Sequence, residues 1–222
     1  MMVVFPLKSS VTTKQLQAAV RANPTDLGTA LGKFVNSDPV TGTPAVLGPN
    51  QKTTTIAQMK AGHYGILCFV PAPDGTPHAA HGMITTFDVK GSKSSYTPPT
   101  DGVQSVTLSD TAITTPPGNA PKSITLKVTN AGKDPHGFQL VKLEAGKTIA
   151  DAYNYFTAFF NSGTATGTAP GTLVGGVDTV APGQTAYLTW NLPAGHYAYV
   201  STSGDSPNDD YTKGLKGEFD IA

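Results

Sequence analysis

Residues 61–89, AGHYGILCFVPAPDGTPHAAHGMITTFDV, contain the chain's single cysteine, Cys68, at the end of an apolar run. The run predicts a buried strand, and the alternating residues 84–89 predict a second one. Between them a turn rich in Pro and Gly leads to His78, His81 and Met83. A thiol, imidazoles and a thioether are therefore expected at one end of a strand pair.

These donors are the kind that copper proteins use. Thiolate, imidazole and thioether suit a trigonal site of two histidines and one cysteine with a weak axial methionine. We expect Cys68, His78 and Met83 to be copper ligands, and His81, a weaker candidate, is read first as a surface imidazole. The alternative for Cys68 is a plain buried thiol, which behaves as a small apolar side chain.

The composition argues against several classes of function. The formal net charge is zero and 14% of residues are charged, so no basic surface for nucleic acid or anionic lipid is expected. No segment approaches the roughly 18 apolar residues of a membrane span. The strand-and-turn composition suits an exported protein, yet MMVVFPLK lacks the features of a signal peptide. We expect an extracytoplasmic protein (secreted, periplasmic or at the cell surface) whose signal peptide is absent from this chain.

An internal repeat organises the chain. LPAGHYAYVST at 192–202 matches QMKAGHYGILCF at 58–69, and KGLKGEFDI at 213–221 matches HGMITTFDV at 81–89. The helical segment KTIADAY matches VTTKQLQ in the same way. The chain therefore reads as two copies of one β-rich unit.

The copies predict domains at 1–91 and 101–222, joined by a linker at 92–100. The first copy lacks its opening strands, because a gapless extension of the repeat places His136 opposite the position just before Met1. Either the native polypeptide begins upstream and supplies a histidine there, or the first copy is incomplete by nature. An incomplete copy would expose sheet edges that pair with another chain, giving a homo-oligomer.

The stretch 62–83 resembles the copper loop of cupredoxins, the plastocyanin and azurin superfamily. These proteins carry Gly-x-Tyr before the cysteine, then Pro-His-x₄-Met, and the matching residues are Gly62, Tyr64, Cys68, Pro77, His78 and Met83. VTNAGKDPHGF, with Asn130, Gly132 and His136, resembles the segment that presents the first histidine of the family.

The resemblance implies an all-β fold of two Greek-key β-sandwiches with short helical insertions. It also implies one type 1 copper in the first copy, one-electron transfer or copper carriage, and a redox partner protein. Two departures stand out. The gap of nine residues between Cys68 and His78 is long, so PAPDG would have to bulge outward, and the first histidine is not in this chain.

The second copy has a different ligand set. Ser201, Asp210 and Leu215 stand opposite the three donors of the first copy, so only His136 remains. We expect this copy to be a metal-free sandwich, with His136 as a weak candidate ligand for the first copy. The acidic stretch SGDSPNDD is interpreted as a solvated turn rather than a calcium site. Met2 and Met59 are interpreted as strand or core residues.

The sequence argues against an enzyme. Two-domain relatives among the cupredoxins include multicopper oxidases, but five histidines with no His-x-His pair cannot build a trinuclear cluster. No Gly-x-Ser-x-Gly or His-Glu-x-x-His motif is present. The alternative function is a metal-free structural or surface-interaction protein that self-assembles through an open sheet edge.

Overall fold

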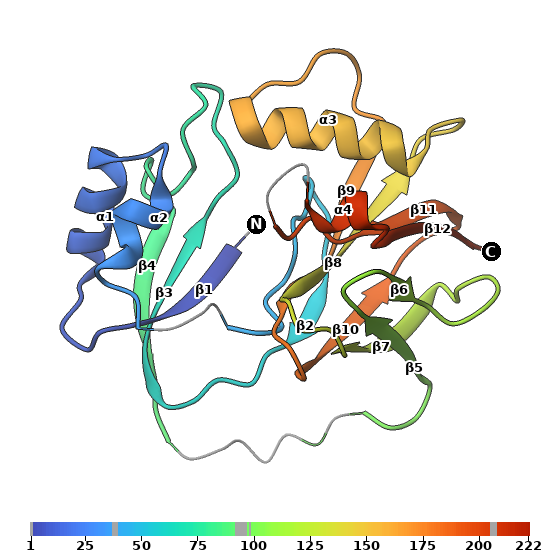
Figure 1. Ribbon diagram of the computed structural model, residues 1–222, viewed down its shortest axis with the longest axis horizontal. Helices are drawn as coiled ribbons and strands as arrows, with labels where there is room; N and C mark the ends of the chain where they lie inside the picture. The colour runs from blue at the N-terminus through green and yellow to red at the C-terminus, as the bar shows by residue number, and fades with distance from the viewer. Residues whose placement is uncertain (1, 37–39, 92–96, 98, 205–207) are drawn as a thin grey trace. The chain divides into compact units, whose positions relative to one another are not determined.

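A computed structural model describes residues 2–36, 40–91, 97, 99–204 and 208–222. Strands dominate, with short helices between them, so the predicted all-β class with helical insertions is confirmed (Figure 1). Most of the expected linker, residues 92–96 and 98, lies outside the described residues.

The chain divides into two compact units, each built from separate segments. Unit one comprises Met1–Val40, Gln58–Ser95 and Phe156–Thr166. Unit two comprises Thr41–Ala57, Tyr96–Tyr155 and Gly167–Ala222. Residues 41–57, which belong to the first copy in sequence, are thus part of unit two.

Unit one is built on an antiparallel sheet in the order β1-β3-β4, formed by β1 (Met2–Leu7), β3 (Gly62–Cys68) and β4 (Ile84–Val89). Helices α1 (Thr13–Ala22) and α2 (Leu27–Gly32) pack on this sheet (Figure 1). Their contact buries one apolar cluster, which includes Val3, Phe5, Leu7, Leu16, Val20, Leu31, Leu67 and Ile84.

The boundaries of α1 follow from its local sequence. The Thr12 side chain accepts from the backbone N–H of Gln15, and the Gln15 side chain accepts from the N–H of Thr12, which completes a capping box. The helix ends at Asn23 because Pro24 follows and disfavours a helical conformation there. Both ends of α1 are therefore set by residues in or beside the segment itself.

Unit two is a β-sandwich. One sheet has the order β2-β10-β7-β5-β6, from β2 (Thr54–Ile56), β10 (Thr185–Asn191), β7 (Ser123–Asn130), β5 (Val103–Leu108) and β6 (Ile113–Thr114). The other has the order β12-β11-β8-β9, from β12 (Lys216–Ile221), β11 (Gly195–Val200), β8 (His136–Leu143) and β9 (Gly171–Val180). Apolar residues of both sheets form a single core. The remaining helices are α3 (Ile149–Ser162) and α4 (Asp210–Lys213).

Strand β9 is rich in glycine, a residue that is usually depleted in strands. Gly175 and Gly176 have φ angles of +98° and +128°, which other residues rarely adopt. A Cβ at Gly176 would lie 2.0 Å from the carbonyl oxygen of Phe138 in β8. The glycines permit a close, bulged pairing of β9 with β8. The spacing of apolar residues in the sequence does not predict this pairing.

The repeated segments have the same strand register in both units. Tyr64 lies opposite Phe87, with ring centroids 5.7 Å apart, and Tyr197 lies opposite Phe219 at 5.6 Å. The equivalent ion pairs are His63–Asp88 at 2.7 Å and His196–Asp220 at 2.8 Å. Residues matched by the repeat therefore occupy matched places, and the ends of β3 and β11 can be compared position by position.

Residues within 41–57 pair with residues that lie 133 positions later in the chain. Thr55 of β2 lies opposite Leu188 of β10, and Pro44 forms a bridge with Val177, so both pairs are separated by the same 133 positions (188 − 55 and 177 − 44). The same step leads from Tyr64 to Tyr197. Pro44 and Leu47 form isolated bridges, with Val177 and Val174 respectively, rather than a strand.

Candidate metal centre

Cys68 and His78 lie together at the end of β3. The Cys68 Sγ atom is 3.7 Å from Nδ1 of His78. Cys68 is the last residue of the strand and is buried, whereas His78 belongs to the loop between β3 and β4. The structure thus brings together two of the three principal ligands expected from the sequence.

The long gap between these two residues is closed by a turn. Pro71 and Pro77 form an antiparallel bridge around PAPDG, and Gly75 has the positive φ angle of +80° that the tip requires. The N–H of His78 then donates to the carbonyl of Val70 at 2.8 Å. The extra residues bulge outward, as the sequence analysis requires, and return His78 to the cysteine.

The separation of 3.7 Å fits two ligands of one metal ion. Metal–thiolate and metal–imidazole bonds of about 2.3 and 2.05 Å, as at zinc, place the two atoms about 3.6–3.8 Å apart for angles of about 110–120°. The same separation also accommodates a weak thiol–imidazole hydrogen bond. Cys68 and His78 are therefore positioned to bind one ion without a large rearrangement.

Met83 follows at the end of the loop. Its N–H donates to the carbonyl of His78 and its carbonyl accepts from the N–H of Cys68, both at 3.0 Å. Its side chain is 55% exposed. The backbone therefore holds Met83 beside the pair, with a thioether that is free of core packing.

His81 and Met2 lie in different surroundings near this pair. His81 is bonded to Thr76 at 2.8 Å and pairs with Asp74 at 3.3 Å, so it is directed toward the turn and is half exposed. Met2 lies in β1, as expected, but it is not a core residue: 47% of its surface is exposed. It lies directly opposite Cys68.

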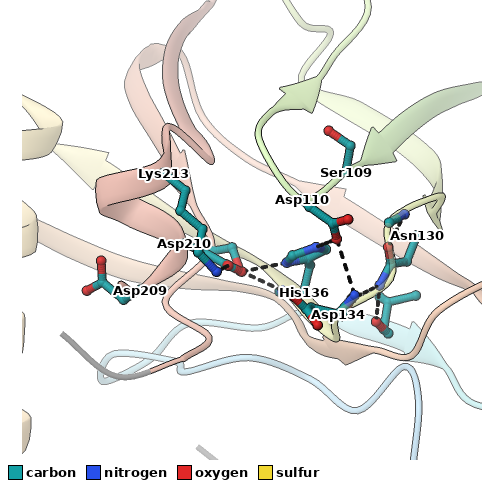
Figure 2. Close-up of polar contacts among 12 residues, drawn as sticks. Ser109, Asp110, Asn130, Asp134, His136, Asp209, Asp210 and Lys213 are labelled. Carbon is teal, nitrogen blue, oxygen red and sulfur yellow. Dashed lines mark hydrogen bonds and ion pairs between the residues drawn. The ribbon is translucent and has the colours of Figure 1, made fainter. Parts of the chain in front are cut away.

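At the equivalent end of β11 in unit two, the polar side chains are hydrogen-bonded to one another. Figure 2 shows His136 between two carboxylates, with Nδ1 2.6 Å from Asp210 Oδ2 and Nε2 3.0 Å from Asp110 Oδ1. Ser201 Oγ donates to the same oxygen of Asp210 at 2.6 Å and accepts from the N–H of Gly137 at 2.8 Å. Three of the four compared positions are thus joined in one network.

This network occupies both ring nitrogens of His136. Nδ1 and Nε2 are each hydrogen-bonded to a carboxylate oxygen, so neither is free to bind a metal ion. The hydrogen bond from His136 is the main cause that lowers the pKa of Asp110, with the N–H groups of Asp134 and Lys133 adding to it. Leu215, at the fourth position, is fully buried.

The loop that presents His136 is organised by Asn130. Its side chain donates to the carbonyls of Asp134 and Val180 and accepts from the N–H of Gly132. A Cβ at Gly132 would lie 2.3 Å from Asp110 Oδ1 and 2.9 Å from the imidazole. The Asn-x-Gly motif thus permits the close approach of Asp110, a residue that the sequence analysis did not identify.

The acidic stretch after β11 is not a solvated turn. Asp209 and Asp210 are both buried, and Asp209 caps α4 by accepting from the N–H of Thr212 at 3.0 Å. It also accepts a hydrogen bond from the hydroxyl of Tyr153. Asp205, the third carboxylate, lies outside the described residues. The solvated-turn expectation is therefore wrong for Asp209 and Asp210, which have protein partners.

Two features are absent from the described residues. No group of three or more His, Cys, Asp or Glu side chains in the described part of the chain is arranged to hold a metal ion. No helix within the described ranges is long and apolar enough to cross a membrane.

Comparisons with known proteins gave structural similarities only. No family model and no curated protein matches the sequence. A reduced auracyanin from Roseiflexus castenholzii is 18% identical, with a TM-score of 0.36, over 56% of this chain and 99% of its own. An azurin from Methylomonas sp. strain J is 14% identical, with a TM-score of 0.35, over 55% and 99%. A multicopper oxidase from Pediococcus acidilactici is 13% identical, with a TM-score of 0.32, over 58% and 27%. At these values no residue role is transferred from any of them.

Proposed function

We propose that this chain is a cupredoxin-like copper protein that binds a single copper ion in unit one, through Cys68, His78 and Met83. Its function is copper carriage or one-electron transfer to a partner protein. The observation that carries the proposal is the 3.7 Å separation of Cys68 Sγ and His78 Nδ1. The loop motif supports it, because His-x₄-Met follows the cysteine strand as in the cupredoxin pattern.

Each residue has a distinct role in the proposed site. The bound copper supplies one-electron chemistry or serves as the cargo. Cys68 provides the thiolate from a buried strand end, which limits its access to solvent oxidants. His78 offers Nδ1 from a loop held by backbone hydrogen bonds, among them the one from its own N–H to the carbonyl of Val70. Met83 adds a thioether held beside them by the backbone.

We further propose that the chain is a tandem of two cupredoxin-like copies, at 1–91 and 101–222, in which the second copy has lost its metal. The identical registers of the repeated strands support the common origin. The network of His136, Asp210 and Ser201 supports the loss, since it satisfies the groups that a metal would otherwise join. The composition supports an extracytoplasmic location.

Copper binding after removal of free metal tests the proposal. The full chain is mixed with Cu(I) or Cu(II), gel-filtered and assayed for copper per chain. One equivalent is expected for the native chain, and Cys68→Ser and His78→Ala should abolish stable binding.

His81→Ala is the matched control, because it removes an imidazole from the same loop that is bonded to Thr76 and not to Cys68. It should bind one copper. A native chain that binds none, or a Cys68→Ser variant that binds as well as the native chain, would leave a metal-free structural protein as the function. If His81→Ala loses copper binding and His78→Ala keeps it, His81 rather than His78 is the imidazole ligand.

A further inference from the structure

Met2 occupies a special place relative to the copper site. In the antiparallel pair of β1 and β3 it lies directly opposite Cys68. Directly opposed residues of such a pair project their side chains to the same face of the sheet, with Cβ atoms about 4.5–5.5 Å apart. The Met2 thioether therefore belongs to the same face and the same strand end as the cysteine thiol.

Exposure separates this methionine from an ordinary strand residue. In the described part of the chain, two large apolar side chains are exposed, Met2 at 47% and Met83 at 55%, and both adjoin Cys68. The counterparts in unit two are Phe138 and Leu215, with exposures of 1% and 0%. Apolar packing accounts for the buried Phe138 and Leu215, but it does not account for the exposed Met2 and Met83.

The donors around Cys68 are consequently rich in sulfur. A thiolate, two thioethers and one imidazole form a soft set, and soft thiolate and thioether ligands select Cu(I). The imidazoles of the other two histidines of unit one have partners of their own: His63 is bonded to Asp88 and Val11, and His81 is bonded to Thr76. The oxidised ion would lack the second imidazole of a type 1 site.

We infer that Met2 is a ligand of the site in unit one and completes a Cu(I) site of three sulfurs and one nitrogen with Cys68, His78 and Met83. The assignment rests on the proposed copper site and selects carriage of Cu(I) over electron transfer. Cys68 binds as the thiolate and releases its proton to solvent, and copper stays in one oxidation state. The two exposed thioethers are where an incoming ion would first be bound.

Competition for Cu(I) tests the inference. The full chain, under reducing and anaerobic conditions, competes with a chromogenic Cu(I) chelator, and X-ray absorption at the copper edge counts the sulfur ligands. We expect Met2→Leu to weaken Cu(I) binding by about tenfold or more and to lower the sulfur count from three to two, since even outer partners of a metal site contribute about tenfold to affinity. Met83→Leu should do the same.

Met59→Leu is the matched control. Met59 precedes the first residue of β3, whereas Cys68 is the last residue of that strand. Replacement of Met59 should therefore leave the Cu(I) affinity and the sulfur count unchanged. Circular dichroism checks that each variant is folded. If Met2→Leu matches the native chain while Cys68→Ser loses Cu(I), the Met2 assignment fails and the copper site stands. If the native chain does not bind Cu(I) or Cu(II) at Cys68, the proposed function itself fails.

Discussion

Strands β3 and β11 end in matched places, yet their ends are chemically opposite. In unit one, Cys68 and His78 face each other, and the methionines beside them are exposed. In unit two, Ser201 and Asp210 stand at the same positions and are joined to His136 by hydrogen bonds. The difference shows how a buried polar strand end is satisfied without a metal: each buried polar group has a hydrogen-bond partner.

The largest expected effect comes from breaking that network. Asp210→Ala leaves His136 Nδ1 and Ser201 Oγ without their shared acceptor in a buried place, which should lower the free energy of unfolding of unit two by about 3–5 kcal/mol. Urea unfolding followed by fluorescence of Trp190, the single tryptophan, reports on unit two. Asp220→Ala is the control, since it breaks an exposed pair and should cost under about 1 kcal/mol.

Asp178 sharpens the contrast between two buried carboxylates of unit two. Burial raises its pKa from 3.8 to about 6, and it accepts from Thr179 Oγ1 at 3.5 Å. Because the folded pKa is raised, the stabilisation from its protonated form is complete below pH 3.8 and is lost as the pH rises through about 6.

Asp178→Asn should therefore stabilise unit two above pH 7 by up to about 3 kcal/mol, from 1.36 kcal/mol for each pKa unit. The Trp190 unfolding curves at pH 4.5 and 7.5 test this. The variant should differ much less between the two pH values than the native chain. Equal pH dependence in both chains would show that Asp178 is not the group that titrates.

Gly132→Ala tests the loop that presents His136. The new Cβ would crowd Asp110 Oδ1 and the imidazole, so a loss of about 1–3 kcal/mol from unit two is expected. Gly32→Ala, which meets no atom within 4 Å in α2 of unit one, should not shift the Trp190 transition. A stable Gly132→Ala chain would mean that Asp110 is not held against His136.

A matched pair of substitutions has the smallest expected effect. The hydroxyl of Tyr64 donates to the carbonyl of Lys60 at 2.8 Å, and that of Tyr197 donates to Pro193 at 2.7 Å. Replacement of either by Phe should cost about 1 kcal/mol in its own unit. Thiol labelling of Cys68 reports on unit one and Trp190 fluorescence on unit two. If the Tyr64 variant destabilises unit two, or the Tyr197 variant destabilises unit one, the two tyrosines are not equivalent.

The sequence predicts those features that depend on local pattern. The helix that begins within VTTKQLQ and the strands that contain Cys68 and Ile84 follow from residue types and spacing. The repeat also identifies Ser201 and Asp210 as the residues at the places of the unit-one donors. Their bonds to one another come from tertiary pairing, which a pattern does not encode.

Three features could not be predicted for physical reasons. Strand β9 is held by pairing with β8 despite its glycines, so tertiary contact overrides propensity. Asp110 approaches His136 only because the β5–β6 turn lies against the His136 loop. Met2 looked like a strand or core residue, because the apolar run gives no sign that its side chain stays exposed beside Cys68.

The central claim is that the end of β3 binds copper and the end of β11 does not. Histidine side-chain NMR of the ¹⁵N-labelled full chain during addition of one equivalent of Cu(I), which is diamagnetic, compares His78 with His136 directly. The account predicts that the Nδ1 resonance of His78 shifts in proportion to the copper added, and that both nitrogens of His136 keep their resonances. A shift at His136, or no shift at His78, would contradict it.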